Sequence, residues 1–267
     1  MSGFDGTALS WTVRDGVVDV TLHRAPANEI GTVMLSDLER LVAELPRLEQ
    51  DAAALVLRST LPAGFSAGAD LRELHGAVRD LDPEARVAGV RVFLRRIHAV
   101  LDALDTTSLV TVAALHGVTF GGGFELALVC DLLVADRMAR FAFPELRLGL
   151  VPGFGGVARL ARDTGSGVVR DLLLTGRSLN AARAHALGIV SQLVAEGQSA
   201  EAALGTARQV AKLDRRAAAE AKRLAKPLPR EALDREIRVF CELFARPEVL
   251  RALERFVQSR EAMPYLP

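Results

Sequence analysis

The stretch "HGVTFGGGFELALVCDLLVAD", residues 116–136, places three consecutive glycines before a run that is almost wholly apolar. Glycine lets the backbone approach a ligand closely, and a helix that begins after such a turn presents N–H groups without intrahelical partners. Glu125 falls in the first turn of this predicted helix, inside a pattern typical of a protein core. Removing a carboxylate from water is costly even after the protein relaxes. The helix dipole offers one structural explanation for the position of Glu125.

A second glutamate poses the same question further along the chain. Glu145 ends a short apolar strand predicted from "RFAFPE" and precedes "LRLGLVPG", where a purely structural explanation is harder to find. Two carboxylates beside a site that binds a developing negative charge are what a proton-transfer enzyme needs, because one exchanges a proton at carbon while the other handles water. The pair therefore indicates proton-transfer chemistry.

Two glycine-containing turns follow predicted strands and would supply such a site. The first turn is "FSAGADL", residues 65–71, and the second is the three-glycine turn. One backbone N–H from each turn would together stabilise an oxyanion. The alternative is that both are ordinary tight turns between a strand and a helix. The glycines match neither the G-x-G-x-x-G dinucleotide fingerprint nor the G-x-x-x-x-G-K-[ST] phosphate loop.

Strand and helix patterns alternate through the first half of the chain. Runs of apolar residues predict strands, and apolar residues spaced for one helical face predict helices. The predicted elements are strands over 16–23 and 52–59, helices over 32–50 and about 83–104, and a short buried strand that ends at Gly117. This order predicts parallel strands joined by crossover helices, which is an α/β core.

After Gly165 the sequence patterns are helical only, and Pro227 and Pro229 mark a joint between helices. A helical tail of this kind packs against its own core or against a partner subunit. Within it, residues 207–230 carry eight basic side chains against two acidic ones. A solvated helix face explains this bias, and the alternatives are binding of RNA or of another polyanion.

The composition is that of a globular protein with 267 residues and equal numbers of basic and acidic side chains, 33 of each. Zero net charge argues against a dedicated binder of nucleic acid or of a membrane surface. The start of the chain lacks the pattern of a secretory signal, and no apolar run approaches the ~20 residues of a membrane helix. Cys130 and Cys241 are expected to be buried thiols, and the five scattered histidines predict no metal site. We therefore expect a cytoplasmic protein.

Taken together, these motifs closely resemble the crotonase superfamily and, within it, the enoyl-CoA hydratases. The matching stretches occur in the order of the family: "RAPANEI", "FSAGADL", "HGVTFGGGFELALVCDLLVAD", "ARFAFPELRLGLVPGFGGVARL", "LLLTGRSLNAARAHALGIVSQLV" and "RFVQSREAMPY". The resemblance implies a spiral of repeated ββα units over residues 1–200. It also implies a C-terminal helical region, residues 201–267, that closes the coenzyme A site and joins subunits into a homotrimer or homohexamer.

The resemblance also assigns roles at the reacting end of an acyl-coenzyme A thioester. The amides of Ala69 and Gly122 match the oxyanion hole. Glu125 matches the glutamate that activates water, and Glu145 matches the one that exchanges a proton with the α-carbon. No metal or organic cofactor is implied, since coenzyme A is part of the substrate.

Four further residues match the part of the family's site that binds coenzyme A. Arg72 corresponds to a basic residue near the phosphates, and Ala27 and Ala67 correspond to backbone contacts with the adenosine end. Asp70 is grouped with them as a substrate-binding residue. Two departures from the family pattern, the missing Lys-Pro in "TTSLVTVAALHG" and the Glu-Ile in "PANEI", concern the preference for the acyl chain rather than the reaction.

The sequence thus predicts a 2-enoyl-CoA hydratase with no nucleic-acid or membrane partner. One alternative is an enoyl-CoA isomerase or another acyl-CoA lyase of the superfamily, which would use the same carboxylates. The other is a non-catalytic RNA-binding homologue, which the basic stretch over 207–230 would suggest and the intact glutamate pair disfavours.

Overall fold

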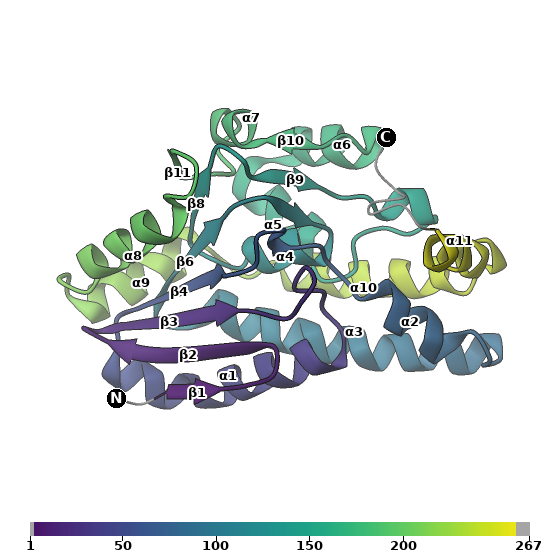
Figure 1. The fold of residues 1–267 in the computed structure, drawn as a ribbon, viewed down its shortest axis with the longest axis horizontal. Coiled ribbons are helices and arrows are strands. Elements are labelled where there is room, and N and C mark those ends of the chain that lie inside the picture. The colour runs from purple at the N-terminus through teal and green to yellow at the C-terminus, as the bar shows by residue number, and fades with distance from the viewer. Residues whose placement is uncertain (1–2, 260–267) are drawn as a thin grey trace.

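The computed structural model describes residues 3–259, and its centre is a seven-stranded sheet with the order β1-β2-β3-β4-β6-β8-β11 (Figure 1). The first three strands form an antiparallel meander, and every pairing from β3 to β11 is parallel. Its strands are β1 (Gly3–Asp5), β2 (Leu9–Arg14), β3 (Val17–Leu22), β4 (Ala54–Ser59), β6 (Val110–Leu115), β8 (Leu132–Asp136) and β11 (Gln192–Val194). The strands predicted over 16–23 and 52–59 and the strand before Gly117 are confirmed as β3, β4 and β6.

A second, four-stranded sheet with the order β10-β9-β7-β5 lies beside the first. The strands β5, β7 and β9 run parallel, and β10 is antiparallel to β9. Its strands are β5 (Gly64–Ser66), β7 (Val118–Phe120), β9 (Arg140–Ala142) and β10 (Leu179–Asn180). β5, β7 and β9 directly follow β4, β6 and β8 in the chain, so each of these three strands of the large sheet leads into a short strand of the small one.

The two sheets are linked by a repeated unit of two strands and a helix. In each unit the first strand joins the large sheet, the second joins the small sheet, and a helix follows. The units are β4–β5–α2 (Leu71–Val78), β6–β7–α4 (Gly122–Ala127) and β8–β9–η1 (Glu145–Leu148)–α5 (Gly156–Thr164), where η1 is a 3₁₀ helix. The predicted α/β fold with repeated ββα units is confirmed.

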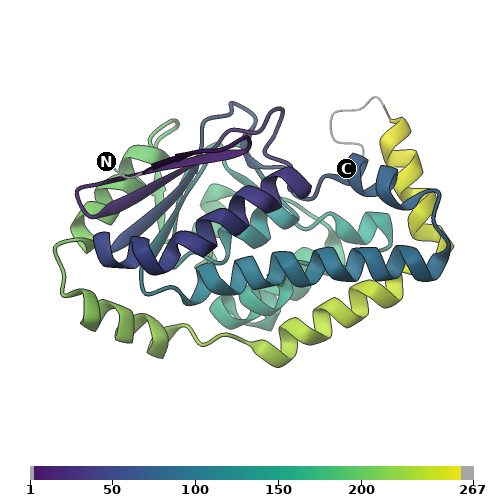
Figure 2. The ribbon, with the colours of Figure 1, turned by 90° about the horizontal axis from the view of Figure 1, so that it is seen from below.

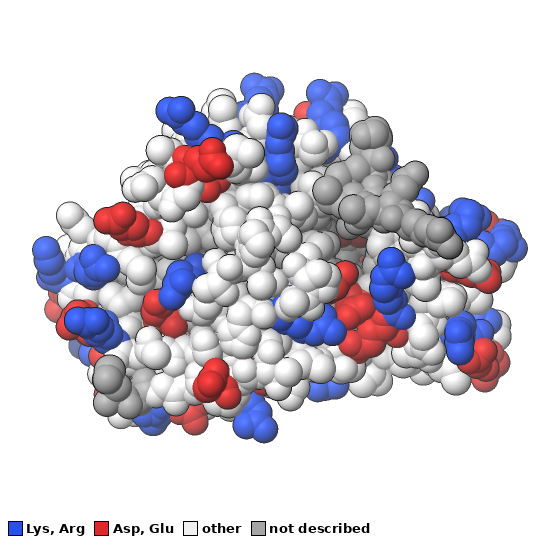
Figure 3. Space-filling model, viewed as in Figure 1, with Lys and Arg blue, Asp and Glu red and all other residues white. Residues whose placement is uncertain are grey.

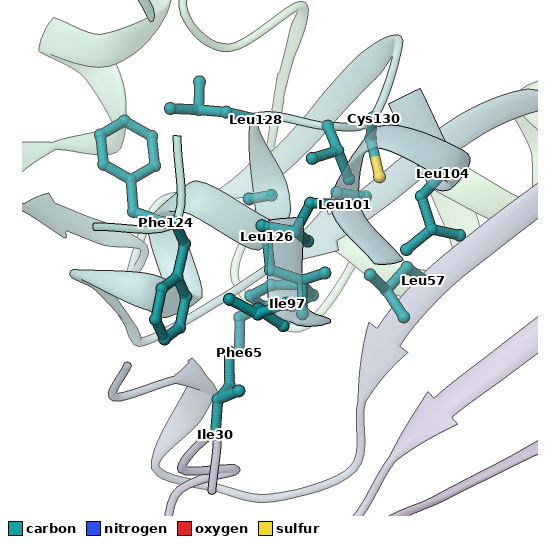
Figure 4. Packing of buried hydrophobic residues seen from close by; sticks show 14 of the residues in the cluster. Ile30, Leu57, Phe65, Ile97, Leu101, Leu104, Phe124, Leu126, Leu128 and Cys130 are labelled. Atoms are coloured by element: carbon teal, nitrogen blue, oxygen red, sulfur yellow. The ribbon is translucent and has the colours of Figure 1, made fainter. Parts of the chain in front are cut away.

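Both faces of the large sheet are covered, which explains why its central strands are apolar without alternation. On β4, Leu55 and Leu57 belong to the main core with the long helices α1 (Thr32–Asp51) and α3 (Pro83–Thr106), the two helices predicted from spacing. Their neighbours Ala54 and Val56 pack instead with α8 (Ser199–Val210) on the other face. Figure 2 shows α1 and α3 crossing beneath the sheet, and Figure 4 shows Leu57 packing with residues of α3 and α4.

The C-terminal part is helical apart from two short strands. Its helices are α6 (Ser166–Thr175), α7 (Ala181–Ala186), α8, α9 (Arg215–Ala225), α10 (Arg230–Phe244) and α11 (Pro247–Gln258). The prediction of helices alone after Gly165 is wrong at β10 and β11, since strands of two or three residues are too short to show a period. The joint at Pro227 and Pro229 is confirmed between α9 and α10.

The division of the chain at 200/201 stays a prediction, and it falls inside α8. This helix packs against β3, β4, β6 and β8, and its Ala203 and Ala207 are fully buried. The motif "RFVQSREAMPY" begins in α11, but its residues after Ser259 lie outside the described part of the chain. Over residues 3–259, no helix is long and apolar enough to span a membrane, and the cytoplasmic location stays a prediction.

Candidate active site

A cavity of about 320 Å³ lies where α2, α3, α4 and η1 meet. Ala69, Gly122, Glu125 and Glu145 all line it, although three separate ββα units contribute them. The rest of the lining is predominantly apolar and comes largely from α2 and α3, with Phe154 and Phe240 closing one side. The fold therefore brings together the four residues that the sequence singled out for chemistry.

The amides of Ala69 and Gly122 are held close together by glycine geometry. Gly68 and Gly121 precede them with φ of +100° and +49°, a region that L side chains rarely adopt. A Cβ on Gly68 would lie 2.8 Å from the Phe120 oxygen and 3.1 Å from the Gly122 nitrogen, so the two turns are in contact. Within residues 3–259 neither amide donates a hydrogen bond. Two free N–H groups of this kind are what an oxyanion requires.

Glu125 is buried, with 1% of its surface exposed, and is held by backbone amides. Its Oε1 accepts hydrogen bonds of 2.8 Å from the amides of both Phe154 and Gly156. Burial raises the pKa of Glu125 to about 7, and the two amide bonds oppose this rise only in part. The carboxyl group can therefore exchange a proton near neutral pH.

Glu145 lies at the start of η1 and is partly exposed as a residue, but one of its carboxyl oxygens is buried. Its Oε2 is buried and has no hydrogen-bond partner in the described chain. Burial and, next, the negative charge of Glu125 raise the pKa of Glu145 well above its ordinary value. At neutral pH the pair thus favours a protonated Glu145 beside a Glu125 that is close to its titration midpoint, which is a poised acid and base.

A third buried carboxylate, Glu236 on α10, escaped the sequence analysis. It is 7% exposed, and it accepts hydrogen bonds from the amides of Gly155 (2.6 Å) and Ala158 (3.3 Å). Burial and then the charge of Glu125 raise the pKa of Glu236 to about 8. The signal that could have found it is its place in the apolar stripe of α10, between Leu233 and Phe240.

The residues predicted to contact coenzyme A lie near one another, and the side chains among them already have partners. The Ala67 amide donates to the Ala27 oxygen at 2.9 Å. Asp70 caps α2 by accepting from the Glu73 amide and forms a 3.0 Å ion pair with Arg24.

Arg72 contacts the C-terminal helix α11. Its Nη1 donates to the Val257 oxygen at 2.8 Å, and its guanidinium lies 6.0 Å from the centre of the Phe256 ring. The helix α11 thus packs against α2, which follows the turn that contains Ala69. The roles of Ala27, Ala67, Asp70 and Arg72 toward coenzyme A stay predictions.

Three of the eight basic residues in the stretch over 207–230, namely Arg215, Lys222 and Lys226, bind other parts of the chain. Arg215 donates to the backbone oxygens of α1, and Lys222 donates to the Leu109 oxygen. Lys226 donates to the Val129 oxygen and pairs with two aspartates. On the face seen in Figure 3, basic and acidic side chains are interspersed rather than gathered by sign. These contacts support the structural explanation of the stretch, in which its charges fasten α9 to the core.

Known proteins resemble this chain in sequence and in fold. A sequence model of the family described as "Enoyl-CoA hydratase/isomerase" matches residues 12–263. A Rhizobium meliloti (strain 1021) protein named "Probable enoyl-CoA hydratase" is 36% identical over 250 residues, which cover 91% of this chain and 92% of that protein. The human "Enoyl-CoA hydratase domain-containing protein 2, mitochondrial" is 37% identical over 197 residues, 73% of this chain. The chain spans only 64% of the length of this human relative.

A solved structure gives the same picture of the fold. The crystal structure of an enoyl-CoA hydratase from Bacillus halodurans superposes with a TM-score of 0.82, covering 93% of this chain and 99% of that one. The two sequences are 23% identical, so this likeness concerns the fold alone.

Proposed function

The chain belongs to the enoyl-CoA hydratase/isomerase family, and we propose that it is a 2-enoyl-CoA hydratase, which adds water across the 2,3-double bond of an acyl-CoA thioester. The observation that carries this proposal is the pair Glu125 and Glu145, which line one cavity and whose pKa values are both raised by burial. Hydration needs a base for water and an acid for carbon, and the two carboxyl groups fill these roles.

In the proposed reaction, ionised Glu125 takes a proton from water as the water oxygen bonds to C3. The electrons of the double bond move toward the thioester, and the negative charge on its oxygen is stabilised by the amides of Ala69 and Gly122. Glu145 then gives its proton to C2. Losing one oxyanion donor typically lowers the rate by about 10²–10³. The pKa of Glu145, which is raised well above its ordinary value, suits the acid, and the value of about 7 suits Glu125 as the base.

The apolar lining of the cavity favours a substrate whose acyl group is a hydrocarbon chain. Beyond the glutamates, α2 contributes Leu74 and Val78, and α3 contributes Val90, Phe93 and Leu94. Apolar side chains of this kind bind a chain through the area removed from water, at about 0.8 kcal/mol for each methylene. We therefore propose that the acyl chain runs between α2 and α3, and that no metal or organic cofactor takes part in the reaction.

The test is a panel of 2-enoyl-CoA thioesters of increasing length, with hydration followed by loss of the conjugated enoyl-thioester absorbance. Wild type should hydrate crotonyl-CoA and at least one longer thioester, and Glu125→Gln should lose most of this activity. An isomerase would behave differently, because it moves a proton between C2 and C4 and can use Glu145 alone. If Glu125→Gln interconverts 3-enoyl and 2-enoyl thioesters as well as wild type while neither hydrates, the hydratase proposal is wrong.

We also propose that the subunits assemble into a homotrimer or homohexamer. Three leucines on or beside the C-terminal helices are more than half exposed: Leu174, Leu213 and Leu224. The enoyl-CoA hydratase/isomerase family is typically oligomeric, and a partner subunit would remove these side chains from water. Sedimentation at micromolar concentration should show a trimer or a hexamer, and a monomer would contradict the proposal.

A further inference from the structure

The turn over residues 153–158, which leads into α5, is held by side chains from four different helices. His98 of α3 contacts the Gly153 oxygen at 2.8 Å, and Arg159 of α5 donates to the Phe154 oxygen at 3.1 Å. Glu125 of α4 and Glu236 of α10 accept from the amides of the turn. Every one of these side chains is buried, so the turn is fixed from several sides without solvent.

The two glutamates take alternate amides of this turn. Glu125 Oε1 accepts from Phe154 and Gly156. Glu236 Oε1 accepts from Gly155, the residue between them, at 2.6 Å. Gly155 has a φ of +98°, a backbone conformation that glycine adopts without strain and that other residues rarely adopt. A movement of the Gly155 amide would therefore displace both amides that hold Glu125.

We propose that Glu236 is a positioning residue, which fixes the turn so that its amides hold Glu125 in the orientation required to accept a proton from water. This inference rests on the proposed hydratase function. Glu236 lies on α10, more than 100 residues from Glu125 in the chain, and forms no ion pair in the described structure. The amides of the turn are its hydrogen-bond donors.

Glu236 also contributes charge to the site. The charged groups that interact with it are Glu125 of α4, Glu145 of η1 and Arg159 of α5, and Asp102 pairs with that arginine. His98 of α3 contacts the Gly153 oxygen of the same turn. The negative charge of Glu236 raises the pKa of Glu145, and the charge of Glu125 raises that of Glu236. The pKa of Glu236, about 8, lies above that of Glu125, about 7, so Glu236 already holds its proton while Glu125 titrates. Neutralising Glu236 should therefore lower the pKa of Glu145 rather than that of Glu125.

The test compares Glu236→Gln and Glu236→Asp with Glu242→Gln, which changes an exposed carboxylate on the same helix. With crotonyl-CoA, Glu236→Gln should lower kcat about tenfold or more, the scale of one charged hydrogen bond, while KM changes less than about twofold. The basic limb of its pH profile, which belongs to Glu145, should move to lower pH, while the acidic limb of Glu125 stays in place. Glu236→Asp keeps the charge but shortens the reach, so kcat should fall while the limbs stay in place. Glu242→Gln should match wild type.

A measurement without turnover separates this inference from the function itself. NMR titration of carboxyl-labelled glutamates, with the Glu145 signal assigned through Glu145→Gln, should show its midpoint fall in Glu236→Gln and not in Glu242→Gln. If wild type turns over no enoyl-CoA but the midpoint moves, the hydratase proposal fails and the coupling stands. An unchanged midpoint together with unchanged kcat would overturn the inference. If Glu236→Gln does not fold, wild-type kcat in Glu236→Asp would overturn it.

Discussion

Two buried acidic regions lie on either side of α5, and they treat negative charge in opposite ways. In the first region, Glu125 and Glu145 line the cavity and Glu236 binds the turn beside it; none of the three forms an ion pair within residues 3–259, and burial raises all three pKa values. On the other side, Asp105 is fully buried but pairs with three cations, and its pKa is lowered. The cations are Arg159 (2.7 Å), Arg162 (3.0 Å) and Lys226 (2.9 Å).

The difference teaches how to distinguish a structural charge from a reactive one. A buried carboxylate with cationic partners stays ionised and holds elements together, here α3, α5 and the end of α9. A buried carboxylate without a cation keeps its proton into the neutral range and is available for chemistry. Arg159 connects the regions, because it pairs with Asp105 and also donates to the Phe154 oxygen of the turn beside Glu125. The following experiments test this contrast, from the largest expected effect to the smallest.

The largest effect is expected from neutralising either reacting carboxyl group. Glu125→Gln and Glu145→Gln should each lower kcat for crotonyl-CoA hydration by about 10²–10⁴, the usual worth of a general acid or base. The double variant should lose little more than either single variant, because groups that act as a unit are not additive. Urea unfolding should show no loss of stability. Hydration by Glu125→Gln at the wild-type rate would show that Glu125 is not a reacting group.

Neutralising Asp105, which pairs with three cations, should lower the stability of the fold and leave the reaction rate nearly unchanged. Asp105→Asn leaves Arg159, Arg162 and Lys226 facing a neutral amide, and breaking a buried pair typically costs about 3–5 kcal/mol. The free energy of unfolding measured in urea should fall by this amount, while kcat per folded molecule stays within a few-fold of wild type. A loss smaller than about 1 kcal/mol would show that the network contributes little.

The dependence of stability on pH should have opposite sign in the two regions. The pKa of Glu125 rises from 4.5 to about 7 on folding, so the folded state binds the extra proton. Its contribution is present below pH 4.5 and is lost as the pH rises toward 7, by at most about 1.4 kcal/mol per unit. Asp105, whose pKa is lowered from 3.8, stabilises above that value and loses its contribution as the pH falls below it.

The free energy of unfolding in urea, measured from acid pH to neutral pH, tests both predicted pH dependences. Glu125→Gln should flatten the decline between pH 4.5 and 7, and Asp105→Asn should flatten the loss in acid. A decline as steep in Glu125→Gln as in wild type would contradict the raised pKa of that carboxyl group.

The smallest effect is expected for an ion pair that lies on the surface. Glu220 pairs with Arg223 at 2.6 Å on the surface of α9, with both side chains more than half exposed. Such pairs contribute little, so Glu220→Gln should change stability by no more than about 0.5 kcal/mol and leave kcat unchanged. A loss as large as that of Asp105→Asn would mean that burial is not what separates the regions.

Much of the fold could be predicted from local patterns. The strands β3, β4 and β6 and the helices α1 and α3 follow from apolar periodicity, since each is long enough to show it. The strands β10 and β11 could not be predicted in this way, because they exist through pairing with β9 and β8 rather than through their own composition. Glu236 was missed for a related reason, since a single glutamate in an amphipathic helix does not reveal which backbone it meets.

By itself the sequence determined which residue types stand at the two glycine turns and at Glu125 and Glu145, and hence the family and the chemistry proposed for it. Only the tertiary structure decided how these carboxyl groups hold their protons. A pKa depends on exclusion of water and on charges from any part of the chain, so it cannot be read from neighbours in sequence. Glu125 is held by amides of a turn 29 and 31 residues away, which Glu236 fixes from α10. Asp105 is ionised because Arg159 and Lys226 reach it from α5 and from the residue that follows α9.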